Sequence, residues 1–198
     1  MVGRTVTDSE HHRFETAEHL GGFLSNGDPD TMFPDMWNWL VETWEVRSVI
    51  DIGCGDGYAL NYFRELGCTV VGIEGVPQDD PNIVQHDYET GPFRPEGSPF
   101  DLAWSAEFLE HVEEQYIPNF METFKAARFA CVTHGEPGQP GWHHVNNAES
   151  SYWKGVFAAN GFEFDEGLTA MTRALSSKNE RPFNHYRRSG LAFRRRDV

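Results

Sequence analysis

The sequence predicts an α/β fold, with a mostly parallel sheet of seven strands, helices on both faces of the sheet and a small lid. The first observation behind this prediction is that short apolar segments typical of buried strands alternate with longer segments of helical periodicity. The second is that each polar or glycine-rich motif directly follows a predicted strand. Ligands bind beyond the carboxyl ends of parallel strands, so these motifs are expected to meet at one edge of the sheet.

The elements can be assigned in chain order. A helix is predicted over 30–44, because its apolar side chains form one helical stripe and Pro34 suits a first turn. Further helices are predicted over 58–66, around 117–124 and up to Gly161. The predicted strands are 49–52, 68–73, 82–85, 100–105, 129–133, 162–164 and 190–194.

A chain of 198 residues with 39% hydrophobic content is expected to form one domain. Residues 1–29 are polar and glycine-punctuated, so they are interpreted as an N-terminal arm before a domain at 30–198. The segment at about 165–189 follows the sixth strand and should therefore project over the motif-bearing edge, which makes it a candidate lid. A surface excursion away from the site is the alternative interpretation.

The composition limits the classes of function. A net charge of −15 argues against a large contact with nucleic-acid phosphates and favours a small-molecule or sugar acceptor. No apolar run approaches the ~20 residues of a membrane helix. The three cysteines show neither a metal-binding spacing nor a disulfide framework, which predicts a cytoplasmic protein. The sequence does not indicate an oligomeric state.

The segment 49–57 joins a buried strand to a glycine-rich turn, and a helix follows. Glycines allow a ligand to approach the backbone closely, and the amides at a helix start point toward it. Tyr58 stands where the dinucleotide-binding fingerprint requires its third glycine, and no Gly-Lys-Ser/Thr phosphate loop is present. Acidic side chains in the turn suit a cationic ligand. The residues predicted to bind it are Asp51, Gly53, Gly55 and Gly57.

Polar residues at the ends of the next strands extend this candidate site. Glu74 ends the second strand, 17 residues after Gly57, about where folds of this type place a carboxylate on the ribose hydroxyls. Asp87 and Tyr88 follow the third strand, and Ser105 ends the fourth. All four are predicted to bind the cofactor, although Asp87 could instead cap a turn.

The segment after the fourth strand carries candidate metal ligands. Glu107, Glu110 and His111 have the spacing i, i+3 and i+4, which places them on one face of a helical turn. Two carboxylates and an imidazole suit Mg²⁺, Mn²⁺ or Zn²⁺. Without a metal, a histidine is expected to act as a general base. The candidates for this catalytic role are His111, His134, His143 and His144.

The pattern Asp-x-Gly-x-Gly-x-Gly resembles motif I of the class I S-adenosylmethionine-dependent methyltransferases, and the resemblance covers about 46–165 and the last strand. It implies a Rossmann-like three-layer sandwich. It also implies that the turn holds the amino-acid end of S-adenosylmethionine, that Glu74 binds both ribose hydroxyls and that Asp87 meets the adenine amino group. The cofactor is a sulfonium cation, which agrees with the acids in the turn.

The string Glu-Phe-Leu-Glu-His-Val resembles a motif of ubiquinone-pathway O-methyltransferases and of small-RNA 2′-O-methyltransferases. The resemblance implies a divalent cation held by Glu107, Glu110 and His111. The RNA enzymes add a histidine from a later loop, a position that His143 or, preferably, His144 would take. Small stand-alone methyltransferases with the Glu-x-x-Glu-His motif are also similar.

The expected function is therefore S-adenosylmethionine-dependent O-methyl transfer to a small polar acceptor, with or without a metal. Two other classes remain open. A nicotinamide-dependent oxidoreductase would use the same fold, but Tyr58 and the absence of a Tyr-x-x-x-Lys pair argue against it. A non-catalytic protein that only binds the cofactor would show the same glycine turn.

Overall fold

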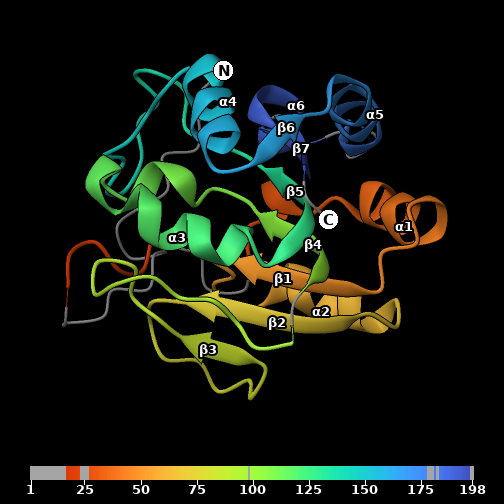
Figure 1. Ribbon diagram of the computed structural model, residues 1–198, viewed down its shortest axis with the longest axis horizontal. Helices are drawn as coiled ribbons and strands as arrows, with labels where there is room; N and C mark the ends of the chain where they lie inside the picture. The colour runs from red at the N-terminus through yellow and green to blue at the C-terminus, as the bar shows by residue number, and fades with distance from the viewer. Residues whose placement is uncertain (1–16, 23–26, 98, 178–180, 182, 197–198) are drawn as a thin grey trace.

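The computed structural model describes residues 17–22, 27–97, 99–177, 181 and 183–196. It confirms the predicted sheet, whose seven strands follow the order β3-β2-β1-β4-β5-β7-β6 (Figure 1). Only β7 runs antiparallel to its neighbours β5 and β6. The strands are β1 (Ser48–Ile52), β2 (Thr69–Glu74), β3 (Ile83–Gln85), β4 (Phe100–Ser105), β5 (Ala127–Val132), β6 (Phe162–Phe164) and β7 (Leu191–Arg195).

Helices cover both faces of the sheet and make three layers (Figure 1). Buried side chains of α3 (Ile117–Phe124) and α4 (Ser150–Ala159) form one apolar core with the sheet. A second core forms on the other face. Its helices are α1 (Pro34–Thr43), α2 (Tyr58–Glu65), α5 (Glu166–Ser176) and α6 (His185–Ser189). Three short 3₁₀ helices complete the description, namely η1 (Pro29–Thr31), η2 (Leu109–His111) and η3 (Glu114–Tyr116).

The central strands are apolar on both faces because both faces are covered. Successive side chains of a strand point to opposite sides, so Val49 packs with α1 and α2 whereas Ile50 packs with α3 and α4. Asp51 breaks this apolar pattern near the carboxyl end of β1, where its side chain is only 3% exposed. The order of strands reverses between β1 and β4, which is the place where open α/β sheets bind ligands.

The segment predicted as a lid divides into two parts. Asp165 caps α5 by accepting a hydrogen bond from the backbone N–H of Leu168 at 2.8 Å, and α5 then packs against α1 and β7. This helix therefore belongs to the layer that covers the sheet. The connection into α6 differs, because Phe183 and His185 line the cavity described below.

The described part of the predicted N-terminal arm lies against the same cavity. Residues 19–22 line it, and the Leu20 side chain packs so tightly over Gly75 that a Cβ there would clash with it. The rest of the arm up to residue 16, and 23–26, lies outside the described residues. None of the helices formed by the described residues is both long and apolar enough to cross a membrane.

Candidate functional site

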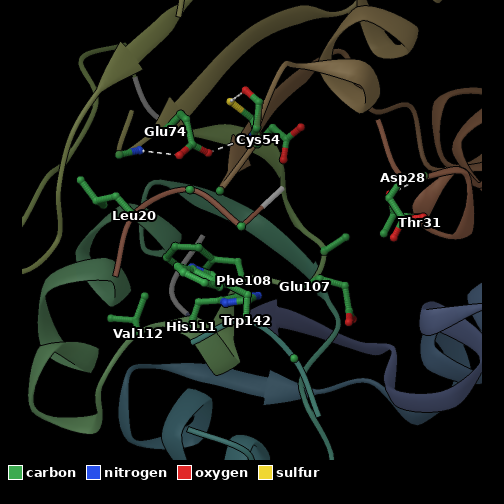
Figure 2. A pocket seen from close by; sticks show the side chains of 18 of the residues that line it. Leu20, Asp28, Thr31, Cys54, Glu74, Glu107, Phe108, His111, Val112 and Trp142 are labelled. Atoms are coloured by element: carbon green, nitrogen blue, oxygen red, sulfur yellow. Dashed lines mark hydrogen bonds between the residues drawn. The ribbon is translucent and has the colours of Figure 1, made fainter. Parts of the chain in front are cut away.

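A cavity of about 820 Å³ opens at the carboxyl ends of β1, β2 and β4 (Figure 2). This volume is in the range of pockets that hold small molecules and cofactors. The structure brings most of the predicted site residues to its wall. They are Asp51, Gly53, Gly55, Glu74, Asp87, Tyr88, Glu107, His111 and His144.

The glycine turn after β1 depends on left-handed backbone conformations. Gly53, Gly55 and Gly57 have φ values of 72°, 52° and 78°, which residues with a Cβ rarely adopt. At Gly53 a Cβ would also lie 2.5 Å from Cδ2 of Phe108. Gly57 does not line the cavity; its N–H donates to the Cys54 carbonyl at 2.9 Å and α2 begins after it. Gly57 thus shapes the turn, whereas Gly53 and Gly55 face the cavity.

Glu74 ties the end of β2 to this turn. One carboxylate oxygen accepts from the N–H of Gly55 at 2.9 Å, and the other accepts from Gly75 at 2.9 Å and Val76 at 3.3 Å (Figure 2). Burial raises the pKa of Glu74, and these three N–H groups oppose that rise. A carboxylate offers about four acceptor positions, so a ligand hydroxyl can still be accepted.

Asp51 is a second acid beside Glu74. Burial first, and then the charge of Glu74, raise the pKa of Asp51 to about 8. Its carboxyl group is therefore largely protonated at neutral pH in the ligand-free protein. A cation in the cavity would reverse this, because an adjacent positive charge favours the ionised form.

The residues after β3 and β4 divide between binding and structural contacts. Asp87 accepts from His19 at 3.1 Å and from the N–H of Glu89 at 2.9 Å, so it caps a turn and also faces the cavity. The Tyr88 hydroxyl donates to Thr123 of α3 at 2.8 Å, which leaves only its ring on the cavity wall. Ser105 is fully buried and does not line the cavity; its hydroxyl donates to the Ile52 carbonyl at 2.8 Å and joins β4 to β1.

The predicted helical turn over residues 107–111 was wrong. Glu107 has a φ of 53°, and a 3₁₀ helix starts only at Leu109. Glu107 therefore does not belong to the same helical turn as Glu110, although its charge still acts on Glu110. The Glu107 carboxylate contacts His185, with 2.8 Å between Oε2 and Nδ1. Among the described residues, the group that could hold a metal is Glu110, His111 and His144, whose ligand atoms lie within 4.8 Å of one another.

The ligand atoms of this cluster lack other partners. Both carboxylate oxygens of Glu110 and the Nδ1 atoms of His111 and His144 are buried without a hydrogen bond from any described residue. Burial and the nearby Glu107 carboxylate raise the pKa of Glu110 well above its usual value. Burial and His144 lower the pKa of His111 to about 4. Unpaired buried polar groups cost about 1–3 kcal/mol each, so the donor set fits a bound cation.

The other two predicted bases are placed differently. His143 does not line the cavity, and its Nε2 is buried without a hydrogen-bond partner in the described structure. His134 is buried and bonded on both sides, with Nε2 2.9 Å from the Ser150 hydroxyl and Nδ1 3.2 Å from the Gly135 carbonyl. Neither side chain is among the described residues that line the cavity.

Comparison with known families decides the class. The family model described as a methyltransferase domain matches residues 9–137, which is more than half of the chain. The chain belongs to this methyltransferase family. The predicted identity is thereby confirmed, and the protein is a class I S-adenosylmethionine-dependent methyltransferase. No curated protein matches this methyltransferase by sequence.

Solved structures show that the methyltransferase fold extends over most of the chain. A Burkholderia thailandensis 1,6-didemethyltoxoflavin-N1-methyltransferase aligns with a TM-score of 0.56 and 15% identity, covering 82% of this chain and 77% of its own. A TehB-like methyltransferase from Corynebacterium glutamicum gives 0.55 and 19%, covering 81% and 87%. Magnesium protoporphyrin IX methyltransferase from Synechocystis PCC 6803 gives 0.54 and 14%, covering 81% and 80%.

Sequence reasoning missed three residues of the methyltransferase cavity. Asp28, His19 and His185 all line it, although they come from segments expected to be an arm and a lid. One local signal existed for His185. Asn184 precedes it and caps α6 by accepting from the N–H of Arg187 at 2.8 Å, and asparagine is a preferred N-cap residue.

Proposed function

We propose that this methyltransferase moves the methyl group of S-adenosylmethionine to a hydroxyl group of a small polar acceptor, beside a divalent cation held by Glu110, His111 and His144. The observation that carries the proposal is the cluster of buried, unpartnered ligand atoms next to a cavity of cofactor size. Carboxylate and imidazole ligands together suit Mn²⁺ or Zn²⁺, and Mg²⁺ less well.

The cofactor is proposed to lie along the turn and the end of β2. The glycines and Asp51 receive its amino-acid end, Glu74 its ribose hydroxyls, and Asp87 its adenine amino group. The sulfonium and amino groups are positive, and the acids that line this part of the cavity attract them. The solved structures of the toxoflavin and magnesium protoporphyrin enzymes contain S-adenosylhomocysteine in the same fold.

The acceptor is proposed to occupy the side of the cavity near Glu107 and His111, away from Glu74 (Figure 2). A bound divalent cation would lower the pKa of an acceptor hydroxyl there. The acids along the wall favour a neutral or cationic acceptor, such as a sugar, over a phosphate or nucleic acid. Seven lining residues are acidic, namely Asp28, Asp51, Asp56, Glu74, Asp87, Glu89 and Glu107.

Calorimetry tests the cofactor and the metal together. S-adenosylhomocysteine is expected to bind the chelator-treated protein, and Mn²⁺ added afterwards is expected to give a separate binding heat. Glu110→Gln should lower the affinity for Mn²⁺ at least about tenfold, since a neutral amide replaces an anionic ligand. Glu113→Gln serves as the control, because its carboxylate is exposed and accepts a hydrogen bond from Gln115 at 2.7 Å. Equal Mn²⁺ binding by Glu110→Gln would disprove the metal site, and failure to bind S-adenosylhomocysteine would disprove the cofactor site.

The substitution Gly141→Ala tests the geometry of the cluster without changing a ligand. A Cβ at Gly141 would overlap the imidazole of His144, so the ring must leave the position that it now holds beside Glu110 and His111. Mn²⁺ affinity is expected to fall about tenfold, while S-adenosylhomocysteine affinity stays within about twofold. Gly155→Ala is the matched control, because a Cβ in α4 meets nothing within 4 Å. Unchanged Mn²⁺ affinity would exclude His144 as a ligand.

A further inference from the structure

We infer that His185 is the general base that removes the proton from the methyl acceptor, and that Glu107 is the positioning residue that orients its imidazole. The inference deepens the proposed function and depends on it, because the acceptor must enter the same cavity. His185 lies outside the metal cluster and beyond residues 9–137, which the family model matches.

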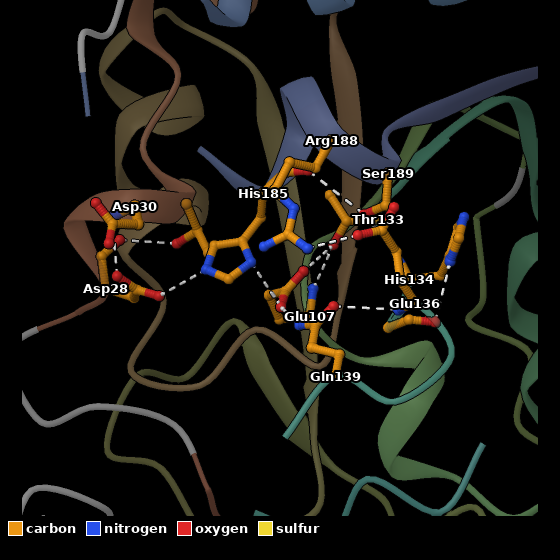
Figure 3. Close-up of polar contacts among 12 residues, drawn as sticks. Asp28, Asp30, Glu107, Thr133, His134, Glu136, Gln139, His185, Arg188 and Ser189 are labelled. Atoms are coloured by element: carbon orange, nitrogen blue, oxygen red, sulfur yellow. Dashed lines mark hydrogen bonds and ion pairs between the residues drawn. The ribbon is translucent and has the colours of Figure 1, made fainter. Parts of the chain in front are cut away.

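The two imidazole nitrogens of His185 have different surroundings. Nδ1 lies 2.8 Å from Oε2 of Glu107, which is hydrogen-bond distance. Nε2 lies 3.8 Å from Oδ2 of Asp28, too far for a hydrogen bond. Figure 3 shows the ring between these two acids, and the side chain lines the cavity with one-fifth of its surface exposed. One nitrogen is therefore bound to the protein and the other is available to a ligand.

The carboxylate of Glu107 is itself held in place. Its Oε1 accepts from the Thr133 hydroxyl at 2.8 Å, and the same hydroxyl oxygen accepts from the backbone N–H of Glu107 at 2.7 Å (Figure 3). The left-handed φ of 53° at Glu107 is a strained conformation for a residue with a side chain. This conformation directs the carboxylate toward His185. An acceptor at Nδ1 keeps the proton there in the neutral ring and leaves the lone pair of Nε2 facing the cavity.

The helix that carries His185 is firmly anchored. Asn184 donates from its side-chain amide to the Ser176 carbonyl at 2.6 Å and caps α6. Tyr186 is fully buried and stacks on Trp104 of β4, with 5.6 Å between the ring centroids and 16° between the planes. A catalytic side chain on a packed element keeps its geometry better than one on a free loop. His185 thus has the fixed position that proton transfer requires.

The proposed step transfers a methyl group to the acceptor and a proton to His185. The acceptor oxygen forms a bond to the methyl carbon while the carbon–sulfur bond breaks, and its electrons convert the sulfonium into the thioether of S-adenosylhomocysteine. The acceptor proton moves to Nε2 of His185 and produces an imidazolium. Its charge is balanced by Glu107 at Nδ1 and by Asp28 near Nε2. The positive charge of the cofactor is thereby transferred to the histidine.

The surrounding charges set the pH at which the base is free. Burial lowers the pKa of His185, but Glu107 beside β4, followed by Asp28 and Asp30 of the η1 region, raises it above its ordinary value overall. His144, from the loop after β5, is a further titratable ring nearby; burial lowers its pKa, and the charge of His185 adds a smaller effect in the same direction. The neutral imidazole therefore becomes available as pH rises through this elevated pKa.

Chemical labelling tests the base without a known acceptor. Diethyl pyrocarbonate reacts with neutral imidazole nitrogens. In the presence of chelator and saturating S-adenosylhomocysteine, it should modify Nε2 of His185 faster than it modifies His134. The rate of modification of His185 should rise with pH. Glu107→Gln removes the anion at Nδ1, so the pH at which labelling of His185 reaches half its maximal rate should move about one pH unit lower. Glu107→Asp should restore part of the shift. No labelling of His185, or an unmoved midpoint in Glu107→Gln, would overturn the inference.

Transfer of a labelled methyl group from S-adenosylmethionine to catechol, methyl glucoside and glycerol provides the second measurement. His185→Gln should lower kcat about a hundredfold with S-adenosylhomocysteine affinity unchanged, since a general base contributes about that much. Arg188→Gln is the control on the same helix, where it removes an exposed ion pair with Glu136. Full turnover by His185→Gln would overturn the inference. If the unaltered protein binds S-adenosylhomocysteine but methylates no probe, the proposed acceptor class fails, and the labelling result still decides the role of His185.

Discussion

The substitution Asp51→Asn is expected to stabilise the cofactor-free protein at pH 8 while it weakens S-adenosylmethionine binding. The pKa of Asp51 is raised to about 8 in the folded state, against about 3.9 in an unfolded chain. The folded state thus favours the protonated form, and the free energy of unfolding falls as pH rises from about 4 to about 8. Each pKa unit corresponds to about 1.4 kcal/mol, so removing this carboxyl should raise stability by several kcal/mol at pH 8 and hardly at pH 4.

Thermal unfolding of the unaltered protein and of Asp51→Asn at pH 4 and pH 8 measures the change in stability, and calorimetry measures the change in S-adenosylmethionine affinity. In the unaltered protein, affinity for S-adenosylmethionine relative to S-adenosylhomocysteine should increase with pH up to about 8, because the sulfonium favours ionised Asp51. Both ligands carry the same amino group, so their ratio isolates the sulfonium. In Asp51→Asn this ratio should not change with pH. The exposed acid Asp79 supplies the control, Asp79→Asn. A pH-independent ratio in the unaltered protein would refute the assignment.

The substitution Glu74→Ala is expected to reduce S-adenosylhomocysteine affinity by about a hundredfold, since hydrogen bonds to a charged group contribute about 1.5–3 kcal/mol each. It also removes the acceptor of three backbone N–H groups, those of Gly55, Gly75 and Val76. Buried N–H groups without a partner are costly, so the glycine turn should lose its fixed conformation. Calorimetry gives the affinity, and amide hydrogen exchange over the turn gives its opening.

The variant Glu74→Gln separates these two effects. It keeps one acceptor oxygen but no charge, so the turn should be protected from exchange more than in Glu74→Ala, while affinity still falls at least about tenfold. The exposed Glu65 at the end of α2 supplies the control, Glu65→Ala. Unchanged affinity in both Glu74 variants would remove this residue from the cofactor site.

Local pattern was sufficient to predict the sheet and the glycine turn that lines the cavity. The bounds of the strands and of the turn were predicted within one or two residues, because buried apolar runs and glycines determine the backbone conformation of their own segment. Glu74 lines the cavity as expected for the same reason, since its position at the end of β2 determines where its side chain lies.

The side of the cavity that contains Glu107 and His185 could not be predicted from local pattern. Glu107 was assigned to a helical turn, but the Thr133 hydroxyl and His185 hold it in a left-handed conformation, and both are distant in sequence. Asp28 and His185 meet only when the segment before α1 and the segment before β7 pack together. Such pairings depend on tertiary packing, which spacing along the chain does not encode.

The position of β7 between β5 and β6 has a consequence for folding during synthesis. β6 has no strand partner among the described residues except β7, and β5 keeps an open edge until β7 inserts beside it. An emerging chain must therefore carry an unpaired strand edge until β7 has left the ribosome, and such edges invite aggregation. His185 opens α6, the helix that leads into β7, so the wall of the cavity is incomplete until the segment joining β6 to β7 has been synthesised and packed.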